Sequence, residues 1–302
     1  LGGKVHRRVR YDAAAVPGVA ETLSITRAVV EGMTAELASM DRIVGVGAAV
    51  PGLVDSTDGS VRLAPHLGWE NEPLAESLSR TLGLPAFAGN DATLGTLAES
   101  VFGAGVEQAD VVYLNGSASG IGGGVIVGGM PLGGAAGFAG ELGHTLVRSD
   151  GLACFCGRRG CLETEVNLGG LLEPLGLKHA DLEQLEEAMA ARRTPGFEAA
   201  AARQLDMLAE ALVNFVNIFN PSTILLGGFL GVLFSFDPRR LQNAVAHGGI
   251  GGLGRQVQIR RAALGADLLL VGAAELAFAD LLAAPAAALN SAEQTPQPAA
   301  GA

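Results

Sequence analysis

Residues 154–161 read CFCGRRGC, and ten residues before the first cysteine stands His144. This short stretch contains all three cysteines of the chain. Three thiolates and one imidazole complete a tetrahedral zinc site and leave no position for a catalytic water. Gly157 and Gly160 let the loop turn back so that the last thiol can meet the first two. The sequence therefore predicts one structural zinc ion, with the ligands His144, Cys154, Cys156 and Cys161.

Two plainer interpretations of the cysteines exist. They could be three ordinary reduced thiols of a cytosolic protein, although such close spacing is uncommon by chance. A redox pair is less attractive, because the stretch contains no C-x-x-C motif.

The composition around this stretch is that of a globular protein. Hydrophobic residues make up 49% of the 302-residue chain and charged residues 17%. The net charge of −11 argues against direct binding of nucleic acid by this chain, since phosphate contacts need clustered Lys and Arg. The most apolar run, residues 224–236, is too short for a membrane span and contains glycines. We therefore expect a cytoplasmic protein with no membrane partner.

Apolar residues at helical spacing alternate with short apolar runs, which predicts the α/β class. The predicted helices are 19–40, 74–82, 92–102, 163–172, 181–191, 197–219 and 268–282. The predicted strands are 43–50, 85–88, 111–114, 124–127 and 222–226, with a glycine-rich turn at 117–123. Residues 285–302 are rich in Ala, Pro, Gln and Ser and predict a disordered tail. The opening Gly2-Gly3-Lys4-Val5 is typical of a turn that leads into a strand, so we expect a first strand before it.

A resemblance to a known family emerges around the cysteine stretch. Residues 132–163, with GELGH at 140–144 and C-x-C-G-x-x-G-C-L-E at 154–163, resemble the ROK family of sugar kinases and sugar-responsive repressors. Weaker matches occur at 47–55, 89–92 and 224–228. The resemblance implies the actin-like, ribonuclease-H-like fold, with a ligand cleft between two α/β lobes. We expect the lobes at 1–90 and 91–284, the zinc loop at 144–161, and a last helix able to pack back on the first lobe.

The resemblance also implies roles for single residues. Five positions match the family's sugar contacts: Asn90, Asp91, Glu141, His144 and Glu163. Asp91 also matches the catalytic base of the kinases. Carboxylates and amides suit this task, because they can bind two neighbouring hydroxyls at once. His144 would hold zinc with one ring nitrogen and a sugar hydroxyl with the other.

Each of these residues also has a plainer interpretation. Asp91 could be only a helix cap, and Asn90 a turn residue. Glu141 and Glu163 could be solvated surface acids.

A kinase would need ATP, held by its phosphates, together with Mg²⁺. The family's first phosphate loop would precede Leu1, and its second usually reads Gly-Thr-Gly, where residues 118–124 here read ASGIGGG. Ala118 adds a side chain where backbone should approach phosphate, and the run is also typical of a tight hairpin. The candidate nucleotide contacts are Ser119, Gly120, Gly122, Gly123, Gly227 and Gly228.

Two segments favour the repressor branch of the family. Residues 164–168, TEVNL, replace the aromatic and small residues of the kinases, and residues 62–69 resemble the regulators, with His66 where the family more often has Asn. We interpret the chain as the sugar-sensing, homodimerising region of a regulator whose DNA-binding helix-turn-helix lies upstream. The alternatives are an ATP-dependent hexose kinase and a zinc-stabilised protein without a ligand. The sequence does not identify the sugar.

Overall fold

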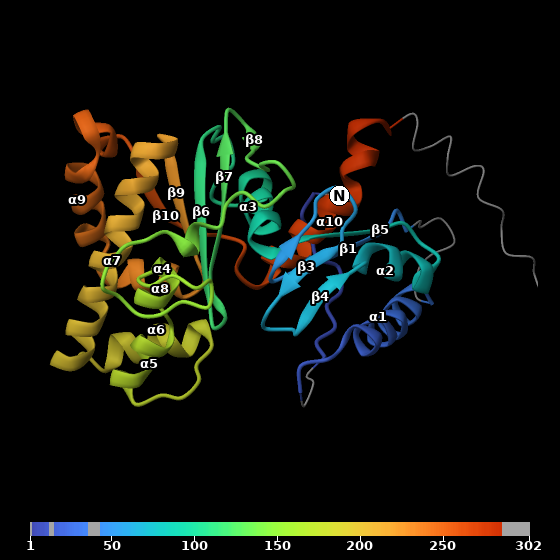
Figure 1. Ribbon diagram of the computed structural model, residues 1–302, viewed down its shortest axis with the longest axis horizontal. Helices are drawn as coiled ribbons and strands as arrows, with labels where there is room; N and C mark the ends of the chain where they lie inside the picture. The colour runs from blue at the N-terminus through green and yellow to red at the C-terminus, as the bar shows by residue number, and fades with distance from the viewer. Residues whose placement is uncertain (1, 12–14, 36–42, 286–302) are drawn as a thin grey trace, which may run out of the picture.

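The computed structural model describes residues 2–11, 15–35 and 43–285. These residues form two halves, each built on sheet and helices, that lie side by side (Figure 1). The predicted α/β class is confirmed. The end of the predicted helix 19–40 and the tail 286–302 lie outside the described residues.

The first half contains two small sheets and two covering helices. Strands β1 (Val46–Val50) and β5 (Ala86–Asn90) form a parallel pair. An antiparallel sheet of three strands is formed by β2 (Leu53–Val54), β3 (Val61–Ala64) and β4 (Trp69–Glu72). The helices are α1 (Val19–Thr34) and α2 (Leu74–Leu82). Trp69 and Leu74 are buried in the core between them. Within the described residues β5 is the only strand paired with β1, so the expected further strand stays a prediction.

The second half is built on a five-stranded sheet in the order β10-β9-β6-β7-β8. Its strands are β6 (Val111–Ser117), β7 (Gly120–Val127), β8 (Met130–Pro131), β9 (Thr223–Gly227) and β10 (Gln258–Arg261). The helices are α4 (Leu162–Glu165), α5 (Gly169–Leu175), α6 (Leu182–Ala191), α7 (Pro195–Phe219), α8 (Gly228–Phe236) and α9 (Pro238–Gly248). Phe197, Phe215 and Phe229 are fully buried in the core of this half.

Helices α3 (Asp91–Phe102) and α10 (Leu268–Ala283) connect the halves. A Cβ on Gly47 of β1 would lie 1.8 Å from the carbonyl oxygen of Ala273, and a Cβ on Gly272 would lie 2.4 Å from that of Leu94. Glycine at these two crossings therefore lets the last helix lie directly on β1 and α3.

The glycine-rich segment is mostly strand, which corrects the predicted turn at 117–123. The hairpin turn is only Ala118 and Ser119, and the glycines after Gly120 belong to β7. A Cβ on Gly122 would lie 2.7 Å from Cβ of Ala92 in α3. The missing side chains thus let a helix approach the strand, a reason that local sequence does not reveal.

Other elements also differ from the prediction. The helix predicted at 163–172 is divided into α4 and α5. The sequence did not predict the sheet β2–β4, strand β10 or helices α8 and α9. Among the described residues, every helix is too short or too polar to cross a bilayer.

A buried carboxylate, Glu99, ties α3 to the segment before α10. Its oxygens accept the backbone N–H groups of Ala104 at 2.8 Å, of Ala263 at 2.9 and 3.0 Å, and of Leu264 at 2.7 Å.

We expect Glu99→Ala to lower the free energy of unfolding by about 3 kcal/mol, since three donors lose their acceptor. Urea denaturation would measure this. Glu76→Ala, which removes an exposed ion pair with Arg80, is the control and should change stability little. A loss below about 1 kcal/mol for Glu99→Ala would contradict the anchoring role.

Candidate functional site

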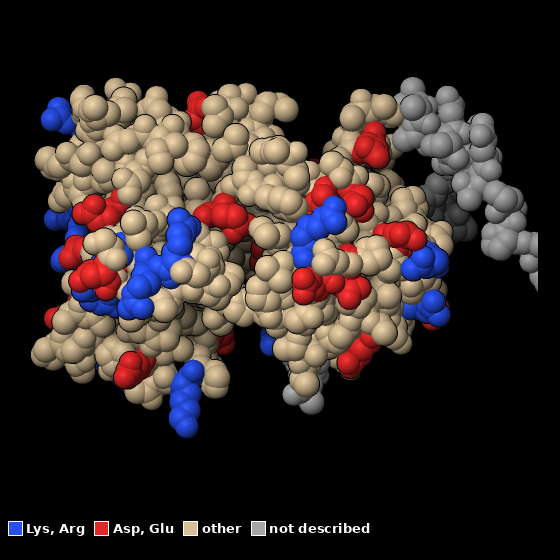
Figure 2. Space-filling view, viewed as in Figure 1, with Lys and Arg blue, Asp and Glu red and all other residues tan. Residues whose placement is uncertain are grey.

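A cleft of about 370 Å³ lies where the two halves meet. Its size is within the usual range for small-molecule sites. The first half contributes Pro51, Gly52, Leu53, Leu63, Pro65, His66 and Asn90. The connecting helix α3 contributes Asp91 and Ala92, and the second half contributes residues of β6, β7 and the loop up to Glu163. Figure 2 shows the molecule from the same side as Figure 1. The surface has a notch above and below the junction of the halves, and both halves carry acidic and basic side chains.

The structure places all five predicted sugar contacts on the wall of this cleft. They are Asn90, Asp91, Glu141, His144 and Glu163. They come from the end of β5, the start of α3, the short helix η1 (Leu142–His144) with the residue before it, and α4. The fold therefore brings together side chains that are up to 73 positions apart in the chain.

Asn90 and Asp91 have different local roles. The Asn90 side chain caps α3, because its Oδ1 accepts the N–H of Thr93 at 2.9 Å, and its Nδ2 donates to the Gly52 carbonyl at 2.9 Å. The cap interpretation thus belongs to Asn90. Asp91 is the first residue of the helix, and burial raises the pKa of its carboxyl above the ordinary value. A carboxylate with a raised pKa is a better proton acceptor.

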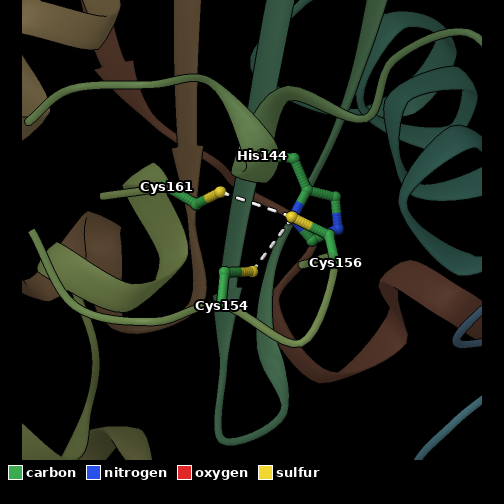
Figure 3. Close-up of side chains that lie close together, drawn as sticks. All are labelled: His144, Cys154, Cys156 and Cys161. Carbon is green, nitrogen blue, oxygen red and sulfur yellow. Dashed lines mark hydrogen bonds between the residues drawn. The ribbon is translucent and has the colours of Figure 1, made fainter. Parts of the chain in front are cut away.

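The predicted zinc ligands form a compact cluster (Figure 3). Their ligand atoms all lie within 4.8 Å of one another. Sγ of Cys154 is 3.5 Å from Nδ1 of His144, and the sulfurs of Cys156 and Cys161 are 3.6 Å apart. Zn–S bonds of about 2.3 Å in a tetrahedron place two sulfurs about 3.8 Å apart. The four residues are therefore close enough together to hold a metal ion such as zinc.

The thiols differ in their electrostatic surroundings. Burial raises the pKa of Cys154 and of Cys161, so these thiols favour the protonated form on their own. The backbone N–H of Arg158 lowers the pKa of Cys156 to about 6. A divalent cation at the cluster would supply the charge that two buried thiolates need.

Two carboxylates lie beside the cluster. Oε1 of Glu163 is 3.0 Å from Sγ of Cys154 and 3.3 Å from Nδ1 of His144. Its side chain is only 10% exposed, so Glu163 is not a solvated surface acid. Glu141 is half exposed and lies 3.9 Å from Nε2 of His144, the ring nitrogen that points away from the sulfurs (Figure 3). Burial raises the pKa of Glu141.

A buried acid that the sequence did not single out, Glu165, positions the metal loop. Its Oε1 accepts the N–H of Leu152 at 2.7 Å, and its Oε2 lies 3.5 Å from Arg203 of α7. Gly160 adopts φ +72°, and a Cβ there would lie 1.6 Å from the Arg148 carbonyl oxygen. One buried carboxylate and a glycine at a close approach thus contribute to the loop conformation.

The candidate nucleotide contacts are divided between two places. Ser119, Gly120, Gly122 and Gly123 line the cleft, whereas Gly227 and Gly228 do not. Each glycine has a packing reason that needs no nucleotide. A Cβ on Gly120 would lie 2.6 Å from Oε2 of Glu163, and one on Gly228 would lie 1.8 Å from the Gly116 carbonyl.

The sequence reasoning did not single out several further lining residues, among them Asn115 and Phe155. His66, which the sequence singled out only as a departure from the family, also lines the cleft. Phe155 stands between two predicted metal ligands, and this position is the signal that could have revealed it.

Comparison with known proteins identifies repressors and glucokinases as relatives. The ROK family model matches residues 5–280. A xylose repressor of Caldicellulosiruptor bescii is 33% identical over 224 residues, which are 67% of this chain and 55% of the repressor. A glucokinase of Thermotoga maritima is 33% identical over 246 residues, or 75% of each protein.

Among solved structures, a ROK family transcriptional regulator, described as a homolog of the Escherichia coli MLC protein, superposes with a TM-score of 0.80 at 25% identity. The match covers 92% of this chain and 73% of that one. The chain spans about half the length of the xylose repressor that it matches. The fold is that of the actin-like ATPases, and the chain belongs to the ROK family.

Proposed function

We propose that this chain is the sugar-binding effector region of a transcriptional regulator, with a structural zinc ion at the wall of its sugar site. The observation that carries the proposal is the convergence of Asn90, Asp91, Glu141, His144 and Glu163 in one cleft beside the Cys/His cluster. The similarity to a xylose repressor and to a ROK regulator structure supports it.

The polar wall of the cleft suits a sugar. Carboxylates accept hydrogen bonds from hydroxyl groups, and two acids beside one imidazole can bind neighbouring hydroxyls together. Nδ1 of His144 would bind zinc while Nε2, on the side of Glu141, would bind a hydroxyl. The ion would thus fix the orientation of a ring that also contacts the ligand. A bound zinc ion would supply folding energy and charge there, with no part in chemistry.

Two features favour a regulator over a kinase. The hairpin turn contains Ala118, whose side chain stands where backbone should approach phosphate. The net charge of −11 suits a region that leaves DNA contacts to another part of the protein.

Regulation would work by differential binding. A sugar that contacts both halves of the chain stabilises the arrangement in which both walls reach it. In a homodimer this would change the spacing of the attached DNA-binding heads and so the affinity for an operator.

A hexose kinase is the second candidate, and the buried Asp91 favours it. Asp91 faces the cleft from the start of a helix with a raised pKa, as a base that removes a hydroxyl proton would. The kinase would hold ATP and Mg²⁺ near Ser119 and the glycines of β7. The similarity to a glucokinase supports this alternative.

Sugar binding and turnover distinguish the candidates. We expect isothermal titration of the complete gene product with xylose and glucose to show binding, and a coupled assay with ATP and Mg²⁺ to show no phosphorylation. Asp91→Asn should weaken binding roughly tenfold or more, because a buried charged acceptor is lost. Asp58→Asn, the same change at an exposed acid outside the cleft, is the matched control. If the wild type phosphorylates the sugar steadily and Asp91→Asn abolishes this activity, the kinase hypothesis replaces the regulator hypothesis.

Metal removal tests the zinc site. We expect metal analysis to find about one zinc ion per wild-type chain and nearly none in Cys161→Ser, with a clearly lower melting temperature. Leu152→Ala, an exposed side chain on the same loop, should keep the metal. Chelation should also weaken sugar binding, because His144 is shared. If sugar affinity survives complete removal of zinc, the shared role of His144 is wrong while the four ligands still stand.

A further inference from the structure

Phe155 is an aromatic residue with no role in the core. Its side chain is 62% exposed, while Phe197, Phe215 and Phe229 are fully buried. It lies between Cys154 and Cys156 on the metal loop and lines the cleft. Folding gains little from a ring that stays in water, so its position calls for a reason outside the core.

The ring extends from the metal loop toward the opposite half. Its centroid is 5.0 Å from that of His144, with an edge-to-face angle of 75°. It is also 6.5 Å from the ring of His66 in the first half, at 76°. Phe155 therefore lies between the proposed sugar-binding histidine and the far side of the cleft.

Apolar residues of the first half continue this surface. Leu63, which is 40% exposed on β3, and Pro65 line the same cleft. The cleft thus has a polar wall of acids with His144, and an apolar wall to which both halves contribute.

We propose that Phe155 binds the C–H face of a pyranose ring whose hydroxyls contact the polar wall. This inference rests on the proposed function and names a residue that selects the ligand. A pyranose has hydroxyls at its edge and C–H groups on its faces, so it matches a cleft with one wall of each kind. An aromatic ring offers a large, rigid apolar surface at a small cost in conformational entropy.

The metal loop would keep this ring in place. Because metal ligands stand on both sides of Phe155, an ion bound by Cys154 and Cys156 restricts the backbone that carries the ring. The ring is thus positioned before the sugar arrives, which strengthens binding.

The experiment compares Phe155 variants of the zinc-loaded complete protein by isothermal titration with glucose and xylose at several temperatures. Phe155→Ala should bind the sugar at least about tenfold more weakly, with a less negative heat-capacity change, because less apolar surface is buried. Phe155→Tyr, which keeps an aromatic face, should stay within about threefold of the wild type. Leu152→Ala changes an equally exposed apolar residue of the same loop that does not line the cleft, and should bind normally. Zinc content and melting temperature should be unchanged in all three.

The outcomes are distinguishable. If the wild type binds sugar and Phe155→Ala binds it equally well, this inference is overturned and the proposed function stands. The inference also fails if stopped-flow measurements show that Phe155→Ala speeds association and dissociation equally, because the ring would then be only a gate. Loss of zinc in Phe155→Ala would assign the residue to the metal loop and also overturn the proposal. Absence of binding by the wild type would overturn both the inference and the proposed function.

Discussion

The glycine strand β7 is the constraint on which the site depends. Gly122 lets Ala92 of α3 lie against the strand, Gly120 lies against the Glu163 carboxylate of α4, and the Ile121 carbonyl lies where a side chain on Gly143 of η1 would be. Three elements that carry the acids and the histidine therefore meet on three consecutive residues of one strand. A side chain larger than hydrogen at these glycines would push the walls of the cleft apart, so the glycines serve the geometry whether or not phosphate ever approaches them.

Electrostatics explains why such a site needs a rigid loop and benefits from a cation. Burial raises the pKa of Glu141 most, His144 lowers it, and Glu163 and Asp91 raise it further. Repulsion between these acids destabilises the wall that carries them, and the hydrogen bond from the Leu152 N–H to the buried Glu165 helps to hold the neighbouring metal loop in place. A divalent ion bound beside Glu163 would offset the repulsion directly. The metal cluster and the acids of the cleft would in this way be electrostatically coupled.

The sequence predicted the α/β class and the cluster of His144 with the three cysteines, because both leave strong local patterns. It also named the cleft acids, but only through resemblance, since no spacing rule relates Asn90 to Glu163. The elements it missed depend on distant contacts. Strand β10 is short and polar and is recognised only by its pairing with β9. The glycines of β7 resemble a turn because their partners, Ala92 and Thr96, lie on another element. Phe155 escapes sequence reasoning because exposure is not visible in sequence.

The two walls of the cleft are relevant to the choice between a regulator and a kinase. The Gly52 carbonyl accepts a hydrogen bond from Asn90, so the turn after β1 and the start of α3 are coupled at the floor of the site. A ligand that contacts Asn90, His144 and the apolar surface of the first half would therefore sense the relative position of the halves. Its effect is limited to the difference between its affinities for the open and closed arrangements. The proposed regulator would need that difference to be large, and an apolar wall shared by both halves would contribute to it, because a pyranose face would meet both parts of the wall only when the halves are close. Phosphoryl transfer would need, in addition, a second ligand at the turn of Ala118 and Ser119 beside Gly120.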